Sequence, residues 1–363
     1  MRIVPYTPEH FAELRAAAQR SGAARSLQHR PFVDYYYATR DSCRLWLAVD
    51  GDGDIAAAMG LEQLPFCYEQ RELRVGCASN FVAFRPGAGG CLFMHWIKTS
   101  DFACVYGGSA DTHRIVRNQK WTYFGGVQTL FLNRRYPTRV GEAFWRRTAK
   151  SVLRAVAPTI DPRGWPAQLA RGSGPRLRAH EEHAVTDDML PTAAPFVFRM
   201  CPDTEYLNWR YHTDLRFVRY RLFRILADDA TAGYVVLNER PGRVIVAHCD
   251  GNDPMLVARG ILLAVAAVSR EHQAAPEVVL TSAHTQMQRV FREFGFRAAG
   301  AERPFALGSR RHAIDLAPDT SRWLINFDWI DNGLRVPFAD QHPSDDTAVA
   351  APDNAAEYEG DAL

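Results

Sequence analysis

The sequence lacks an excess of charge of either sign, and it lacks long apolar runs. Its 43 basic and 41 acidic side chains leave a formal charge of +2 over 363 residues, which indicates neither a nucleic-acid partner nor an anionic membrane surface. No segment approaches the roughly 20 apolar residues that cross a bilayer, and the first ten residues contain no apolar signal core. We therefore expect a cytoplasmic protein without membrane insertion.

Paired cysteine motifs are also lacking. The seven cysteines include no C-x-x-C pair, and several lie in apolar stretches typical of strands, so we expect buried, reduced thiols. Cys91 and His95 are four apart on an expected helix and share one face, but no second cluster completes a zinc site, and we predict no metal. His248 and Cys249 are adjacent in an expected strand and point to opposite faces, which argues against a Cys–His nucleophile.

A glycine-rich turn between an apolar strand and an apolar helix is the strongest feature that is present. The stretch from Asn80 to Ile97 starts with β-branched and aromatic residues, passes through Arg85-Pro-Gly-Ala-Gly-Gly90 and continues with helical spacing. The glycines would let a ligand approach the backbone, where the first amides of the helix and its dipole favour an anion. The alternative is a glycine-rich surface turn between two core elements.

The spacing of Arg85, Ala88 and Gly90 resembles the Arg/Gln-x-x-Gly-x-Gly/Ala loop of the GNAT acyltransferase superfamily, with Ala88 in place of the first glycine. In that family the loop holds the pyrophosphate of acyl-coenzyme A between the fourth strand and the third helix. The resemblance implies acetyl-CoA as the cosubstrate. It places the cosubstrate contacts at Phe84, Arg85, Gly87, Ala88, Gly89, Gly90, Cys91 and Ser109.

A second signature of the family is only partly present. The segment from Ser109 to Trp121 has the expected length, but Ser109 stands for the usual Asn, and Lys120 with Trp121 stands for Gly-Phe. Val116 stands where many family members carry the Tyr that serves as general acid. The resemblance therefore leaves that acid without its usual residue.

The order of the expected elements occurs twice. Residues 1–135 read as strand, helix, hairpin, strand, glycine turn, helix, strand and helix, which is the order of the GNAT fold, and residues 173–310 repeat it. We predict an α+β protein of two tandem GNAT-like domains, each a mixed, mostly antiparallel sheet flanked by helices. The predicted parts are a first domain at 1–156 that ends in a basic helix at 141–156, a linker at 157–175, a second domain at 176–335 and a disordered tail at 340–363.

The second half departs from the family at its cofactor loop. Phe291 and Gly295-Phe296 fit the second signature, but Asp250 and Asp253 precede the long helix, where a pyrophosphate would lie. Each carboxylate repels a diphosphate by on the order of 1 kcal/mol at a few Å in water. We expect only the first domain to bind acyl-CoA.

Acyl transfer to an amine needs a polarised carbonyl and a base for the proton of the attacking amine. The resemblance gives the first task to a backbone N–H in the strand that ends at Phe84, without identifying one residue. Glu62, near an expected strand bend, is our candidate base; a solvated strand-end glutamate is the alternative. Tyr106 is our candidate acid, with Tyr123 a second choice, and packing tyrosines with bonded hydroxyls are the alternative.

The sequence thus predicts an acyl-CoA-dependent N-acetyltransferase that acts on a small-molecule amine in a groove between the domains. Some tandem proteins of this kind look related to polysaccharide assembly, so an amino sugar is the first acceptor to consider. Two alternatives stay open: a Fem-type aminoacyl or peptidoglycan transferase, and an inactive pair that binds a metabolite or a protein partner. The oligomeric state is open, with a homodimer as one option.

Overall fold

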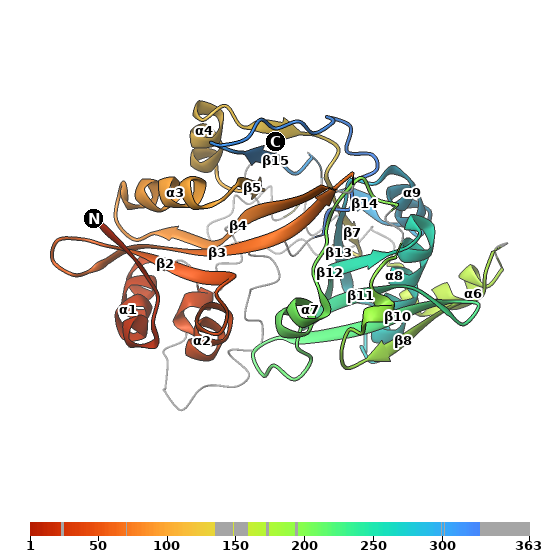
Figure 1. Cartoon of the computed structure of the whole chain (residues 1–363). Helices are drawn as coiled ribbons and strands as arrows, with labels where there is room; N and C mark the ends of the chain where they lie inside the picture. Colours follow the sequence, from red (N-terminus) through yellow and green to blue (C-terminus); the bar gives the residue numbers. More distant parts are fainter. Residues whose placement is uncertain are drawn as a thin grey trace.

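The computed structural model describes residues 1–134 and 159–326, apart from 23–24, 70, 172–173, 193–194, 299 and 301, together with residue 148. Figure 1 shows two lobes, each built around one sheet with helices against it. Apart from residue 148, the expected basic helix at 141–156 lies outside the described residues, as does the expected tail at 340–363. Within the described ranges, every helix is too short or too polar to cross a membrane.

The first sheet contains the strand that leads into the glycine turn. Its strands follow the order β1-β2-β3-β4-β5-β15-β6, with β9 beside β3, and only β4 and β5 pair in parallel. Figure 1 shows α1 and α2 on one side of this sheet and α3 and α4 on the other. The elements are β1 Arg2–Pro5, α1 Phe11–Ser21, α2 Arg30–Ala38, β2 Cys43–Val49, β3 Ile55–Tyr68, β4 Arg71–Ala83, α3 Ala88–Thr99, β5 Phe102–Tyr106, α4 Ala110–Asn118, β6 Thr122–Phe124, β9 Phe198–Met200 and β15 Phe305–Gly308.

The second sheet repeats this order of strands. Read from the edge that corresponds to β1, it runs β8-β10-β11-β12-β13-β7-β14, and only β12 and β13 pair in parallel. The buried helix α8 corresponds to α3, since each connects the two parallel strands of its sheet. The elements are β7 Gln128–Leu132, α6 Trp165–Leu169, β8 Leu177–Glu182, α7 Thr204–Arg210, β10 Arg219–Ala227, β11 Ala230–Arg240, β12 Arg243–Gly251, α8 Pro254–Ser269, β13 Glu277–Ser282, α9 Thr285–Glu293 and β14 Arg297–Ala298.

The two halves of the chain exchange one strand each. Strand β7 belongs to the first half in sequence, but it lies between β13 and β14 of the second sheet. Strand β15 comes from the second half and lies between β5 and β6 of the first sheet. The crossing segments hold each other, because the amide of Gly126 donates to Glu302 at 2.7 Å and the amide of Arg303 donates to Val127 at 2.8 Å. Each sheet is therefore completed by the other half.

A single apolar core joins the facing sides of the two sheets. It includes Phe66 of β3, Phe198 of β9, Tyr234 of β11, Phe305 of β15 and Trp323, all buried. The expectation that all seven cysteines are reduced is wrong for two of them, since Cys67 and Cys201 form a disulfide. The pairing of β3 with β9 brings these cysteines together across 134 residues of sequence. The other five cysteines are free.

Candidate functional site

The glycine turn forms the open N-terminus of α3. Gly87 precedes the helix with φ of 80°, a left-handed conformation that glycine adopts without strain, and no side chain caps the helix. The amides of Ala88 and Gly90 bond within the turn, to Arg85 O at 3.3 Å and Gly87 O at 3.2 Å. Among the described residues, the amides of Gly87 and Gly89 have no backbone acceptor. The turn therefore offers an anion fewer than five amides from positions 87–91, because those of Ala88 and Gly90 are already engaged.

Space in front of the turn is also open. A methyl group built on Gly87 or Gly90 would meet nothing within 4 Å, and one on Gly89 would touch Phe81 at an ordinary 3.6 Å. Cys91, in the same helical turn, is exposed. The residues predicted at 87–91 are thus gathered at one exposed helix start, where N–H groups and the dipole favour a negative group.

Arg85 faces away from this helix start. Its guanidinium forms ion pairs with Asp50 and Asp54, on either side of the turn between β2 and β3. Burial raises the pKa of Asp50, but amide hydrogen bonds from Asp54 and Asp52, together with Arg85, lower it below its ordinary value overall. These ion pairs fasten the end of β4 to the hairpin of β2 and β3. They also mean that two carboxylates already balance the charge of Arg85.

Strand β4 carries a bulge at Asn80. Its pairing with β3 shifts register between Ala58 and Gly60, and Asn80 has φ of 47°. Two residues of β4, Asn80 and Phe81, face one residue of β3 at this shift, so the regular ladder is interrupted there. The parallel pairing of β4 with β5 ends at Cys77 and Cys104, just before this bulge. The resemblance expects a backbone N–H in this strand that polarises the carbonyl. The bulge, beside the place where β4 and β5 separate, is its candidate position.

A hydroxyl cluster packs against the bulge. Asn80 donates from Nδ2 to the Tyr37 hydroxyl at 2.7 Å, and that hydroxyl lies 3.0 Å from Ser79 Oγ. Gly60 makes the room, since a methyl group there would lie 2.3 Å from Ser79 Oγ. Tyr37 comes from α2 and was not singled out from the sequence. Its position after two other tyrosines gave no signal beyond that of a packing helix.

Glu62 is buried in the middle of β3, not solvated at a strand end. Its side chain is 3 % exposed and accepts a hydrogen bond from the Tyr206 hydroxyl at 2.6 Å. Arg210 of α7 lies 4.0 Å from its second oxygen. Glu62 is opposite Cys77 on β4, so it lies on the same side of the sheet as Ser79, which is opposite Gly60. A carboxylate is thus held on the bulge side of the sheet by the second half of the chain.

Tyr106 and Ser109 belong to β5 and to the connection that follows it, not to the glycine turn. Tyr106 ends β5 in the core, where burial raises the pKa of its hydroxyl against the lowering effects of Arg303, Thr281 and Thr129. Those two threonines belong to β13 and β7, so Tyr106 points toward the second sheet. Ser109 caps α4 by accepting from the Thr112 amide at 3.2 Å. Tyr123 lies on β6, where its hydroxyl is 2.9 Å from His113 Nδ1.

The corresponding helix start in the second half is closed. Asp253 caps α8 by accepting from the amides of Met255 at 2.7 Å and Leu256 at 2.9 Å. Asp250 is buried and paired with Arg199, and burial raises its pKa to about 6 against the lowering effect of Arg199. The carboxylate of Asp253 therefore already takes the amides to which an anion would bind.

Ile325 and Asn326, from later in the chain, lie in the space beside β12. The pairing of β12 with β13 ends at Ile245 and Val279. Beyond it, the side-chain amide of Asn326 accepts from the Cys249 amide and donates to the Cys249 carbonyl, both at 3.1 Å. On the other side, Thr281 donates to the carbonyl of Ile325 at 3.3 Å. In the second half, Ile325 and Asn326 therefore occupy the position that corresponds to the separation of β4 and β5 in the first half.

His248 is held neutral in this second region. Asn326 Nδ2 can only donate, so His248 Nδ1 accepts at 3.1 Å and the ring proton lies on Nε2, 3.0 Å from the Tyr234 hydroxyl. Burial lowers the pKa of His248 to about 3, and Arg199 and Arg210 add to this effect.

Replacing His248 by Gln should therefore destabilise the protein less at pH 5 than at pH 7. The folded pKa lies below the ordinary 6.5, so the unfolded chain binds the proton first as the pH falls, and the wild type loses stability from pH 6.5 downward. At pH 5 this loss is about 2 kcal/mol, which the variant does not share. Urea unfolding at both pH values measures the difference. The raised pKa of Asp250 is common to both proteins and cancels. An identical destabilisation at the two pH values would show that His248 titrates alike in both states.

Comparisons with known proteins support the fold. Neither a protein-family model nor a curated protein matches the sequence. A conserved protein of unknown function from Enterococcus faecalis V583 superposes with a TM-score of 0.52 at 7 % identity, covering 85 % of this chain and 73 % of its own. A GCN5-related N-acetyltransferase from Anabaena variabilis ATCC 29413 gives 0.50 at 10 % identity, with 84 % and 72 % covered. The predicted fold, GNAT-like and present twice in tandem, is confirmed.

Proposed function

We propose that the chain is an N-acyltransferase that binds acyl-CoA, acetyl-CoA first, at the start of α3 and transfers the acyl group to an amine. The observation that carries the proposal is the contrast between two corresponding helix starts. Gly87 leaves the start of α3 open, whereas Asp253 closes the start of α8. The fold shared with the Anabaena N-acetyltransferase supports acyl transfer as the reaction class.

The residues at the bulge of β4 suit this reaction. The thioester supplies an activated acyl group, and the amine nitrogen bonds to its carbonyl carbon as the carbon–sulfur bond breaks. In the proposal a backbone N–H at the Asn80 bulge polarises the carbonyl. Asn80 donates to Tyr37, so the Tyr37 hydroxyl can donate in turn to Ser79, whose own proton is then directed to the leaving sulfur. These hydroxyls would replace the acid that Val116 cannot supply.

Glu62 would accept the proton that the amine loses. It already accepts from Tyr206, which orients its carboxylate, and both residues are buried. Removal of water strengthens such a proton-transfer site. In this arrangement the second domain positions the base instead of binding a second acyl-CoA.

A catalytically inactive pair that binds a metabolite is the second candidate. The amides of Ala88 and Gly90 are engaged within the turn, and Arg85 is paired with Asp50 and Asp54. Both facts reduce the capacity for an anion. Ligand binding without turnover would identify this case.

Calorimetric titration with acetyl-CoA should give one site per chain, because of the two corresponding helices α3 and α8 it is α3 whose start is open. Release of free thiol should follow when an amine is added, and a panel that includes an amino sugar, an amino acid and a polyamine would identify the acceptor. Two equal sites would contradict the closed second helix start. Absence of acetyl-CoA binding would refute the proposed function, and binding without thiol release for any amine would favour the inactive pair.

A further inference from the structure

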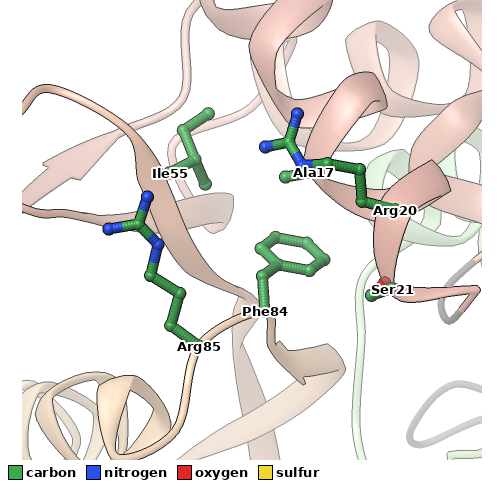
Figure 2. Close-up of a pocket in the computed structure, with 6 residues that line it drawn as sticks. All are labelled: Ala17, Arg20, Ser21, Ile55, Phe84 and Arg85. Carbon is green, nitrogen blue, oxygen red and sulfur yellow. The ribbon is translucent and has the colours of Figure 1, made fainter.

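A small cavity lies at the end of β4, on the α1 side of the first sheet. Its volume is about 140 Å³, room for about four or five waters, which suits a phosphate group better than a nucleoside. In Figure 2 the side chains of Arg20 and Arg85 extend from α1 and from the end of β4 toward the space beside Phe84 and Ile55. The lining is completed by Ala17 and Ser21.

Arg20 supplies the unbalanced charge of this cavity. The two carboxylates that pair with Arg85, those of Asp50 and Asp54, offset its charge and hold it at the wall. Arg20 is exposed, and within the described residues its side chain has no hydrogen bond or ion pair. A guanidinium without a protein partner beside a phosphate-sized space is suited to a phosphate, which it can bind through two parallel hydrogen bonds.

The cavity adjoins the glycine turn. Phe84 and Arg85 line it, and the same two residues connect β4 to Gly87, with both of their amides fixed on Ala56 O at 2.8 and 3.0 Å. A ligand whose diphosphate lies at the start of α3 would therefore bring one of its two neighbouring groups close to this space. In coenzyme A the pantetheine arm would extend toward the β4 bulge, which leaves the ribose that carries the 3′-phosphate on the side of the cavity.

We propose that this cavity is the subsite for the 3′-phosphate of coenzyme A, with Arg20 as its charged residue. This inference rests on the proposed function, since it requires the diphosphate at α3. It adds that the protein distinguishes coenzyme A from dephospho-coenzyme A. Of the two described basic residues that line the cavity, Arg85 is balanced, so the discrimination should depend on Arg20.

The test compares coenzyme A and dephospho-coenzyme A by calorimetry on the full chain. The wild type should bind coenzyme A about tenfold more tightly, and Arg20→Gln should lose that tenfold while its affinity for dephospho-coenzyme A stays unchanged. Arg289→Gln is the matched control. It removes an exposed helical arginine of the second half, 81 % exposed in its side chain, and should change neither affinity. Thermal melting should show all three proteins equally folded, because Arg20 is exposed.

The outcomes separate this inference from the proposed function. Equal wild-type affinity for the two ligands overturns the 3′-phosphate subsite and leaves acyl-CoA binding intact. An equal loss for both ligands in Arg20→Gln also overturns it, since Arg20 would then act on the diphosphate. If neither ligand binds the wild type, the proposed function fails, and this inference fails with it.

Discussion

Replacing Gly87 by Asp is expected to lower the affinity for acetyl-CoA by about 100-fold. The carboxylate would add a negative charge at the open start of α3, although the left-handed backbone of Gly87 differs from the extended backbone with which Asp253 takes two amides of α8. Loss of one charge-assisted hydrogen bond costs about 1.5–3 kcal/mol, and repulsion of the diphosphate adds on the order of 1 kcal/mol. About 3 kcal/mol in total corresponds to the stated factor. Calorimetric titration of the variant measures it.

Asn at the same position is the control for shape. Gly87 has a left-handed conformation, with φ of 80°, that Asn and Asp tolerate better than other side chains. Gly87→Asn adds the same bulk without charge and should cost at most about tenfold in affinity. If the Asp and Asn variants bind acetyl-CoA as the wild type does, the start of α3 is not the binding site.

Separate expression of the two halves is expected to give no folded protein from either. A fragment of residues 1–156 lacks β15, and a fragment of residues 157–363 lacks β7. Each would leave an open slot in its sheet in place of buried residues such as Leu307 or Leu130. Burial of each large apolar side chain contributes about 1.5–3 kcal/mol, and a vacant strand also loses two ladders of hydrogen bonds. These losses are comparable with the 5–15 kcal/mol of a typical domain.

Co-expression should restore a folded complex, because the strands are exchanged reciprocally and no peptide bond between the halves is needed for their pairing. Co-purification through a tag on one fragment, followed by circular dichroism and thermal melting, tests this. A single cooperative melting transition from either fragment alone would show that the exchanged strand is dispensable. The intact chain, carried through the same purification, is the reference.

Several local features of the site could be predicted from the sequence. The strand, turn and helix around Gly87 were predicted correctly, and so was a hairpin before them, which the structure forms from β2 and β3. The closure of the second helix start was indicated by Asp253, which precedes Pro254 and acts on amides two and three residues away. Caps and tight turns involve neighbours in sequence, so their residue types are sufficient evidence.

The surroundings of Glu62 could not be predicted in this way. Its hydrogen bond comes from Tyr206, 144 residues away, and Asn326 bonds to Cys249 across 77 residues. The disulfide between Cys67 and Cys201 spans 134 residues. A glutamate in an apolar strand has the same local sequence pattern whether it is solvated at a strand end or buried with a tyrosine partner. Its burial depends on which element packs over the glutamate, and that element is distant in sequence.

The amino-acid sequence by itself determined the elements, their repeated order and the open turn at Gly87, because these depend on periodicity and on contacts a few residues apart. Only the tertiary structure decided that β7 and β15 change places. A short apolar strand such as β7, Gln128–Leu132, can pair in either sheet with the same alternation of side chains, so its own residues do not specify the sheet. The choice is made by the residues at the crossing, where Gly126 meets Glu302 and Val127 meets Arg303.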